Sequence, residues 1–209
     1  MVDSGIKNIL FDLGGVIIST NRDKCIQAFE ELGVKDAIQL FESELFQQKY
    51  HEFESGFIAA PDFRTFLRSA DTALSKVTDE ELDAAWNSML GEIPASTFTL
   101  LEQLKERYKL YLLSNTNSIH WEWIRNYIFA NCSASMTHYF EQVYLSFRLS
   151  ECKPSTEVYE SVLESAHIKA SETLFIDDKK ENTDAAQELG FPVYNPKSVH
   201  DWSFLFETE

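Results

Sequence analysis

The stretch that restricts the fold most is Ile9-Leu10-Phe11-Asp12-Leu13-Gly14-Gly15, near the start of the chain. Its apolar run is short and uncharged, which is typical of a strand buried inside a parallel sheet. The two glycines permit a tight turn and a close approach of the backbone to a ligand. A carboxylate at the end of such a strand lies where open α/β sheets hold their ligands. Asp12 is therefore either a functional group or the cap of a loop, and this stretch alone leaves both open.

Strand-like and helix-like segments alternate in the second half of the chain, with short connections between them. This alternation predicts right-handed crossovers and an α/β fold with a doubly wound parallel sheet. Further strands are expected at residues 109–113, 142–146, 173–176 and 192–194, and helices at 96–107, 119–129, 154–166 and 181–189.

The segment between the first strand and this alternating part has only helical periodicity. Residues 20–91 predict four or five helices and no strand, among them helices over 24–32, 37–50 and 62–69. Thr78, followed by Glu81 three residues later, predicts a capping box for another helix that reaches about residue 90. We therefore expect residues 1–19 and 92–209 to form the sheet domain and residues 20–91 an inserted helical domain.

The net charge excludes one class of partner. With 34 acidic and 18 basic residues, the chain carries a charge of −16 and would repel a nucleic-acid backbone. A small anionic substrate remains compatible, because a local cluster of cations can bind it. No apolar run is long enough to cross a membrane, and Asp12 interrupts the first one, so we expect no membrane partner and no signal peptide.

The cysteines bear on the cellular compartment. Cys25, Cys132 and Cys152 are an odd number without the spacing of a metal site. This usage predicts reduced, mostly buried thiols in a soluble, cytoplasmic protein.

Polar side chains follow three of the expected strands. Asp12 ends the first strand, Ser114 and Asn115 follow the second, and Asp177 and Asp178 follow a later one. The carboxyl ends of parallel strands share one edge of the sheet, so these groups can converge there. Taken singly, each has an ordinary structural interpretation: Ser-Asn can form a turn, and Asp-Asp can cap a helix. Their order on the expected elements is far more specific.

The charges at this edge call for cations. Three carboxylates cannot all stay ionised side by side without positive charge, and Mg²⁺ prefers oxygen ligands. Lys153, directly before Pro154 at a helix start, can balance further charge, although such a lysine is often simply solvated. Ser114 and nearby backbone amides can hold an oxyanion. A metal, a lysine and an oxyanion cradle are the parts of a phosphoryl-transfer site, and Asp12 could accept the phosphoryl group.

Four motifs, in order, resemble those of the haloacid dehalogenase-like hydrolases. They are Phe11-Asp12-Leu13-Gly14, Leu112-Leu113-Ser114-Asn115, Lys153-Pro154, and Phe175-Ile176-Asp177-Asp178 followed by Asn182. The residues of the first two motifs, together with the helical insert, resemble those of one branch of the family: the sugar-phosphate phosphatases and the epoxide-hydrolase N-domain-like phosphatases. The resemblance implies a Rossmann-like core, with residues 20–91 as a mobile helical cap.

The resemblance also implies a reaction and its residues. It implies a Mg²⁺-dependent phosphatase that hydrolyses a small phosphorylated metabolite, such as a sugar phosphate, through an aspartyl-phosphate. Asp12 would be the nucleophile, and Ser114, Asn115 and Lys153 would bind the phosphoryl group. Asp12, the Gly14 carbonyl, Asp177 and Asp178 would bind the metal, and Asn182 would fix the acidic loop.

The chain departs from the family pattern at Gly14, where most phosphatases of the family carry an acid. Glycine keeps the carbonyl that binds the metal but lacks the side chain that protonates the leaving group, a service worth roughly 10²–10⁴ in rate. His51, Glu52 or Glu54 of the insert could substitute, although the sequence favours a solvated or locally hydrogen-bonded histidine at His51. Glu54-Ser55-Gly56 resembles the turn by which family caps sense substrate, so Glu54 is expected to contact it. Alternatively, the substrate has a good leaving group.

Two other functions remain open at this point. A metal-independent 2-haloacid dehalogenase would also lack the second acid, but such enzymes usually lose the pair that Asp177 and Asp178 preserve. A weak or inactive phosphate-binding protein would explain Gly14 but not the retention of the other site residues. A phosphoacceptor signalling domain is disfavoured, because its acid pair follows the first strand.

Overall fold

A parallel sheet of five strands, in the order β3-β2-β1-β4-β5, forms the centre of the computed structural model, which describes residues 3–128, 136–199 and 201–206. The expected strands are all present, and the prediction of a parallel α/β fold is confirmed. Their bounds are β1 (Asn8–Phe11), β2 (Lys109–Ser114), β3 (Gln142–Leu145), β4 (Thr173–Ile176) and β5 (Val193–Tyr194).

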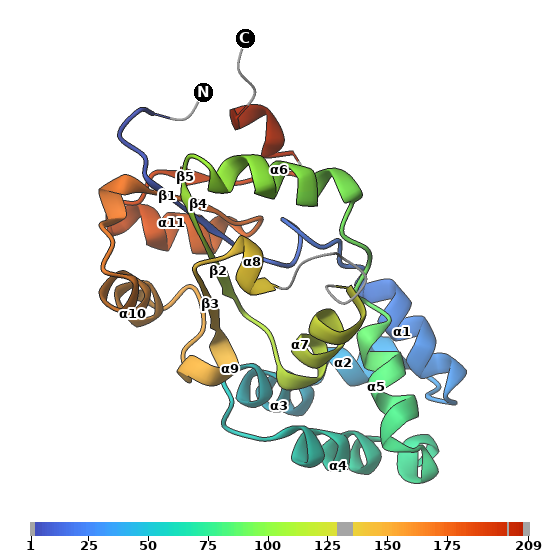
Figure 1. The fold of residues 1–209 in the computed structure, drawn as a ribbon. Coiled ribbons are helices and arrows are strands. Elements are labelled where there is room, and N and C mark those ends of the chain that lie inside the picture. The colour runs from blue at the N-terminus through green and yellow to red at the C-terminus, as the bar shows by residue number, and fades with distance from the viewer. Residues whose placement is uncertain (1–2, 129–135, 200, 207–209) are drawn as a thin grey trace.

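The central strand β1 is buried on both faces. Ile9 and Phe11 belong to one hydrophobic cluster and Leu10 to another on the opposite face, as the two-residue period of a strand requires. Helix α6 packs against the first face through Leu101, while α10 and α11 cover the second (Figure 1). A strand covered on both faces needs a continuous apolar run, and this run is why the strand could be predicted from the sequence.

The segments that surround the sheet differ in detail from those expected. The helix expected at 119–129 is α7 (Ser118–Trp123) continued by a π-helical turn (Ile124–Ile128), and Phe129 lies outside the described residues. The short helices α8 and α9 had no clear periodic signal in the sequence. The bounds are α6 (Ala95–Lys105), α8 (Met136–Tyr139), α9 (Ser146–Leu149), α10 (Thr156–Ala166), α11 (Lys180–Glu188), and 3₁₀ turns at Ala170–Glu172 and Ser203–Phe206.

The insert consists of helices, as its periodicity predicts. Thr78 and Glu81 form the expected capping box, in which the backbone N–H of Glu81 donates to Thr78 Oγ1 at 3.2 Å and the N–H of Thr78 donates to Glu81 Oε2 at 2.8 Å. The exact division into two domains stays a prediction. The helices are α1 (Arg22–Glu31), α2 (Ala37–Glu42), α3 (Glu44–Glu54), α4 (Ala60–Ala70) and α5 (Asp79–Asn87), with a 3₁₀ turn at Thr72–Lys76.

One expected helix is wrong: residues 37–50 do not form a single helix. Ser43 adopts an extended conformation, with φ −64° and ψ 141°, and ends α2. Its hydroxyl then accepts a hydrogen bond from the backbone N–H of Phe46 at 3.2 Å and caps α3. Serine competes for backbone hydrogen bonds in this way, so the apolar spacing on either side concealed a break.

The insert has its own aromatic core. Trp86 of α5 lies 5.1 Å from the ring of Phe63 and 6.1 Å from that of Phe46, and Phe53 stacks on Phe63 at 4.5 Å. Ile119 of α7 is the member of this cluster that comes from outside the insert. The aromatic residues thus hold the insert together and join it to α7.

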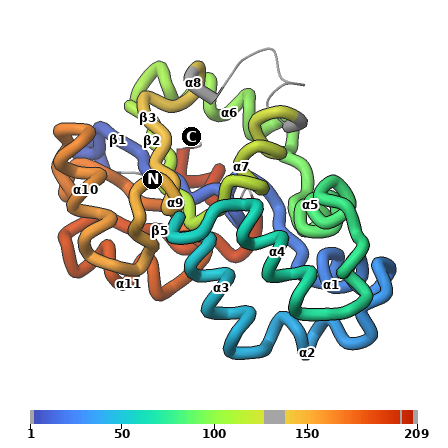
Figure 2. The backbone as a smooth tube through the Cα atoms, turned by 90° about the horizontal axis from the view of Figure 1, so that it is seen from below, coloured from blue at the N-terminus to red at the C-terminus, as the bar shows by residue number. Residues whose placement is uncertain are grey.

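Besides this contact with α7, the described residues of the insert and the sheet domain meet at two further places. Its two connecting segments run side by side, with an antiparallel bridge between Thr20 and Leu90. At the far end, α3 lies beside α9 (Figures 1 and 2). There Ser55 Oγ lies 3.3 Å from Cys152 Sγ, and Gly56 packs on the backbone of Phe147.

The structure bears on two expectations from the sequence: the state of the cysteines and the absence of a membrane-spanning helix. Cys25 is buried and Cys152 half-buried, both as free thiols, while Cys132 lies outside the described residues. Among the helices within the described ranges, none combines the length and apolar composition that a bilayer span requires.

The contact at Gly56 generates a stability prediction. A Cβ at Gly56 would lie 2.1 Å from the carbonyl oxygen of Phe147, at a φ of +71°. Gly190 is a matched control, because its φ is +88° and nothing lies within 4 Å of a Cβ built there. In urea unfolding, Gly190→Ala should lower the free energy of unfolding by about 1–2 kcal/mol through backbone strain alone. Gly56→Ala should cost about 1–3 kcal/mol more, through the clash.

Equal losses for the two variants would contradict the close packing of α3 and α9 that the structure shows.

Candidate active site

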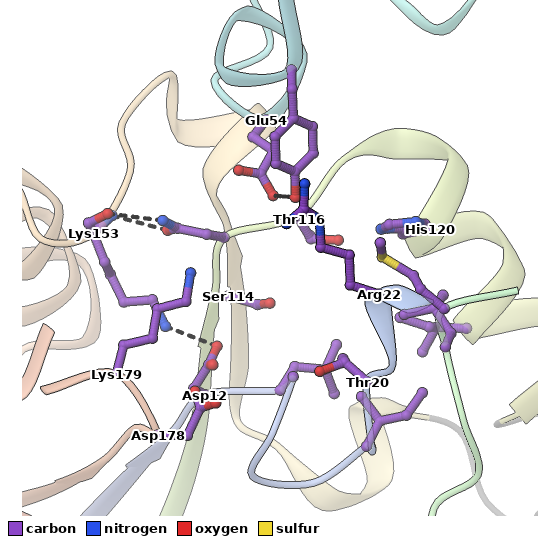
Figure 3. A pocket seen from close by; sticks show the side chains of 18 of the residues that line it. Asp12, Thr20, Arg22, Glu54, Ser114, Thr116, His120, Lys153, Asp178 and Lys179 are labelled. Carbon is purple, nitrogen blue, oxygen red and sulfur yellow. Dashed lines mark hydrogen bonds and ion pairs between the residues drawn. The ribbon is translucent and has the colours of Figure 1, made fainter. Parts of the chain in front are cut away.

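The carboxyl ends of β1, β2 and β4 meet at one edge of the sheet and form the floor of a cavity. Strand register places Phe11 beside Ile176, so Asp12 and Asp177 follow side by side, and the N–H of Asp12 donates to the carbonyl of Ile176 at 2.8 Å. Helices of the insert form the opposite wall, and the cavity has a volume of about 390 Å³ (Figure 3). Of the residues expected at the site, Asp12, Gly14, Glu54, Ser114, Asn115, Lys153 and Asp178 line it, as does Asn182.

Lys153 is buried at the centre of this floor. Its Nζ lies 2.8 Å from Asp12 Oδ1 and 2.6 Å from Asp177 Oδ2, and it donates to the carbonyl of Leu113 at 2.9 Å. Burial opposes its charge, but the attraction of Asp12 and Asp177 outweighs burial and raises the pKa of Lys153. The lysine is therefore a fixed cation between two carboxylates.

Asn115 holds the backbone of this lysine. Its Nδ2 donates to the carbonyl of Lys153 at 2.8 Å, and its Oδ1 accepts from the N–H of Lys153 at 2.9 Å. The sequence predicts a substrate-binding role for Asn115. The structure adds a positioning role, because both ends of the amide are engaged in fixing Lys153.

The two adjacent acids differ in their surroundings. Asp177 is fully buried and accepts hydrogen bonds from Asn182 Nδ2, at 2.9 and 3.0 Å, and from the N–H of Lys179 at 2.8 Å. Asp178 lines the cavity and lies against Gly15, where a Cβ would come within 2.2 Å of its Oδ2. Asn182 thus fixes the acidic loop through Asp177, whereas Asp178 is presented to the cavity.

These carboxylates have the composition of a magnesium site. Oxygens of Asp12, Asp177 and Asp178 all lie within 4.8 Å of one another. Burial raises the pKa of Asp12, Lys153 offsets this only in part, and Asp177 raises it further. Burial and then Asp177 likewise raise the pKa of Asp178. An all-oxygen cluster with excess negative charge fits Mg²⁺, although the individual ligand roles stay predictions.

The three candidate proton donors of the insert, His51, Glu52 and Glu54, differ in their position relative to the cavity. Glu54 is the last residue of α3 and lines the cavity, where Tyr50 donates its hydroxyl to Glu54 Oε1 at 2.5 Å. Burial raises the pKa of Glu54. His51 is exposed, and Glu52 pairs with Lys49 at 2.6 Å; neither lines the cavity. A helical period of 3.6 residues explains why a single member of this cluster faces inward.

Several lining residues carried no sequence signal of a site. Arg22 begins α1, Lys179 follows the acid pair, and both reach the cavity (Figure 3). Both resemble ordinary surface residues in the sequence. Docking of the insert brings Arg22 to the site, whereas Lys179 lies there through its place directly after Asp178. Other members of this set are Thr20, Gln47, Tyr50, Trp86 and Thr116.

His120 lies between the cavity and the aromatic core. Its ring stacks on Trp86 at 5.2 Å, its Nε2 lies 3.2 Å from the carbonyl of Trp86, and its Nδ1 lies 3.2 Å from Asn117 Nδ2. A carbonyl accepts and an amide nitrogen donates, so the ring is neutral with its proton on Nε2. Burial lowers the pKa of His120 to about 4. His120 therefore belongs both to the aromatic packing of the insert and to the lining of the cavity.

Comparison with known proteins agrees with this geometry. A family model described as haloacid dehalogenase-like hydrolase matches residues 6–190. Among curated proteins, D-ribitol-5-phosphate phosphatase of Bacteroides thetaiotaomicron is 35% identical over 197 residues, which cover 94% of this chain and 95% of that protein.

Solved structures show the same relationship. A HAD family enzyme from Bacteroides thetaiotaomicron is 41% identical, with a TM-score of 0.93 over 98% of this chain and 100% of that chain. The wild-type form of that enzyme in complex with magnesium and inorganic phosphate is 40% identical, with a TM-score of 0.88 over 97% of this chain and 100% of that chain.

The buried, neutral His120 generates a pH-dependent stability prediction. In the unfolded chain a histidine binds a proton near pH 6.5, whereas folded His120 stays neutral down to about pH 4. The unfolded state therefore binds more protons in this window, so the His120 contribution to stability is complete above pH 6.5 and declines as pH falls to 4. The decline should reach about 3 kcal/mol.

Urea unfolding of the wild type and His120→Gln between pH 7 and 4.5 checks this. The wild type should lose more stability on acidification than the variant, whatever their difference at pH 7. Identical pH dependence in the two proteins would contradict the neutral, buried imidazole.

Proposed function

The chain belongs to the haloacid dehalogenase-like hydrolase family, and from this membership we propose that it is a Mg²⁺-dependent phosphatase of a small phosphorylated sugar or polyol. The observation that carries the proposal is the buried Lys153 between Asp12 and Asp177, beside a third carboxylate at the cavity floor. Such a cluster combines a carboxylate nucleophile with the cation it needs near a phosphoryl group.

Asp12 is the proposed nucleophile. Its carboxylate attacks phosphorus, the bond from phosphorus to the substrate oxygen breaks, and an aspartyl-phosphate forms; water then attacks phosphorus and releases phosphate and Asp12. Lys153 fixes Asp12 through its contact at 2.8 Å and offers charge to the phosphoryl oxygens. Ser114, buried at the end of β2 and lining the cavity, is proposed to donate a hydrogen bond to the same oxygens.

The metal ligands are proposed from the same cluster. Asp12, Asp177 and Asp178 contribute carboxylate oxygens, and Gly14, which lines the cavity, contributes its backbone carbonyl. Bound Mg²⁺ would neutralise charge on the phosphoryl group and orient it. A relative has been solved in complex with magnesium and inorganic phosphate, which supports a site that binds both.

The proposed substrate is small and rich in hydroxyl groups. A cavity of about 390 Å³ suits a metabolite rather than a polymer. Arg22 and Gln47 offer polar groups on the insert side, where Trp86 also lines the cavity. The relative named D-ribitol-5-phosphate phosphatase supports a pentitol phosphate as the first candidate.

Phosphate release from D-ribitol 5-phosphate and a panel of pentose and hexose phosphates, with and without Mg²⁺, tests the proposal. The wild type should turn over at least one of them with Mg²⁺, and chelation should abolish turnover. Asp12→Asn should lower kcat by at least roughly 10³-fold, because the covalent route is lost. Asp184→Asn is the matched control, since Asp184 pairs with Lys180 on the surface of α11.

Absence of turnover in folded, Mg²⁺-loaded protein, full activity of Asp12→Asn, or metal-independent halide release from a 2-haloacid would each overturn the proposed function.

A further inference from the structure

Gly14 leaves the proposed reaction without an obvious proton donor. A sugar or polyol leaves as an alkoxide unless its oxygen is protonated as the bond to phosphorus breaks. Gly14 lines the cavity beside the nucleophile but offers no side chain. Thr20 occupies the neighbouring space, with its methyl group 3.4 Å from where a Cβ of residue 14 would lie. The hydroxyl of a threonine is too weak an acid to serve, so the proton must come from another group.

The other titratable groups along the cavity can be considered in turn. Asp12 and Asp178 belong to the nucleophile and the proposed metal site, and Lys153 is held in two ion pairs. Arg22 and Lys179 bring positive charge to the cavity, which suits them to bind phosphoryl oxygens rather than to supply a proton.

Two aromatic groups are engaged elsewhere. Both ring nitrogens of His120 face hydrogen-bond partners, the carbonyl of Trp86 and the amide of Asn117. The hydroxyl of Tyr50 donates to Glu54. Among the titratable residues that the structure describes along the cavity, Glu54 is therefore the best placed to exchange a proton with substrate.

Glu54 also has the surroundings of a general acid. It projects from the end of α3 toward the cavity, on the opposite side from Asp12 and Asp178 (Figure 3). A leaving oxygen in line with attack by Asp12 would point to that side. Burial raises the pKa of Glu54 despite the Tyr50 hydrogen bond and the charges of Lys179, His51 and Lys153, which lower it. A carboxyl whose pKa is raised toward neutral pH exchanges protons more effectively than an exposed glutamate.

The residues after Glu54 fix its position. Ser55 contacts Cys152 at 3.3 Å, and Gly56 packs on the carbonyl of Phe147, so the end of α3 is seated on the sheet domain. Cys152 directly precedes Lys153, which binds the nucleophile. The proposed acid and the proposed nucleophile are thus anchored to adjacent residues of one loop.

We propose that Glu54 is the general acid–base catalyst of this enzyme and replaces the side chain that Gly14 lacks. The inference rests on the proposed phosphatase function. As Asp12 attacks phosphorus, the bond to the substrate oxygen breaks and the Glu54 carboxyl gives that oxygen its proton, so that a neutral alcohol leaves. The Glu54 carboxylate then takes a proton from the water that attacks the aspartyl-phosphate, which restores the acid.

Comparison of two leaving groups tests this role. D-Ribitol 5-phosphate, or whichever sugar or polyol phosphate the panel identifies, needs a proton at its leaving oxygen, whereas para-nitrophenyl phosphate releases a stable anion. Glu54→Gln should lower kcat on the former by roughly 10²–10⁴-fold and on the latter by less than about tenfold. Glu52→Gln is the matched control, because Glu52 lies two residues earlier and outside the cavity.

A second variant returns the acid to the position where the family usually has it. The variant is Gly14→Asp, and a Cβ at this position meets only the Thr20 methyl group, at 3.4 Å. In the Glu54→Gln background, this substitution should recover activity on the sugar or polyol phosphate. Thermal unfolding of each variant verifies that the proteins compared are folded.

Other outcomes overturn the inference without touching the proposed function. Equal losses on both substrates would make Glu54 a substrate-binding residue, and full activity of Glu54→Gln would exclude it from the reaction. Selective loss on the sugar or polyol phosphate in Lys179→Met, with none in Glu54→Gln, would assign the proton to Lys179. A wild type inactive on every phosphate would instead overturn the proposed function, and the inference with it.

Discussion

The buried ammonium of Lys153 is the interaction on which the site depends. It lies between Asp12 and Asp177 and is itself held by Asn115 through two backbone hydrogen bonds. A buried charge without a partner costs several kcal/mol, so none of these groups can be removed without penalty to the others. The lysine therefore fixes Asp12, the proposed nucleophile, and joins the ends of three strands. The three carboxylates carry more negative charge than Lys153 compensates, and a bound divalent cation would balance the rest.

The cavity exists because two separately packed units meet over this cluster. The sheet domain presents the charged floor, and the insert supplies the opposite wall from helices held together by Phe46, Phe63 and Trp86. The contact of Gly56 with Phe147 seats the end of α3, and with it Glu54, above the floor. Under the proposed function, the sheet domain would carry the chemistry of phosphoryl transfer, and the insert would carry proton transfer and substrate choice.

The parts of this account that the sequence predicted are those governed by local rules. The apolar run before Asp12 identified a buried strand, and the capping box at Thr78 placed a helix start. What the sequence missed depends on tertiary packing. The break at Ser43 was hidden by apolar spacing on both sides of it, and Arg22 became a cavity residue only when the insert docked. The choice among three nearby acids likewise needed the orientation of α3.

The proposed reaction requires Asp12 to become covalently phosphorylated. Quenching the enzyme during turnover with borohydride reduces an aspartyl-phosphate to homoserine, which peptide mass spectrometry locates in the chain. If Asp12 is the nucleophile, homoserine should appear at position 12, and only when both Mg²⁺ and a phosphorylated substrate are present. Homoserine at another position, or an unmodified Asp12 in an enzyme that is turning over, would contradict the account.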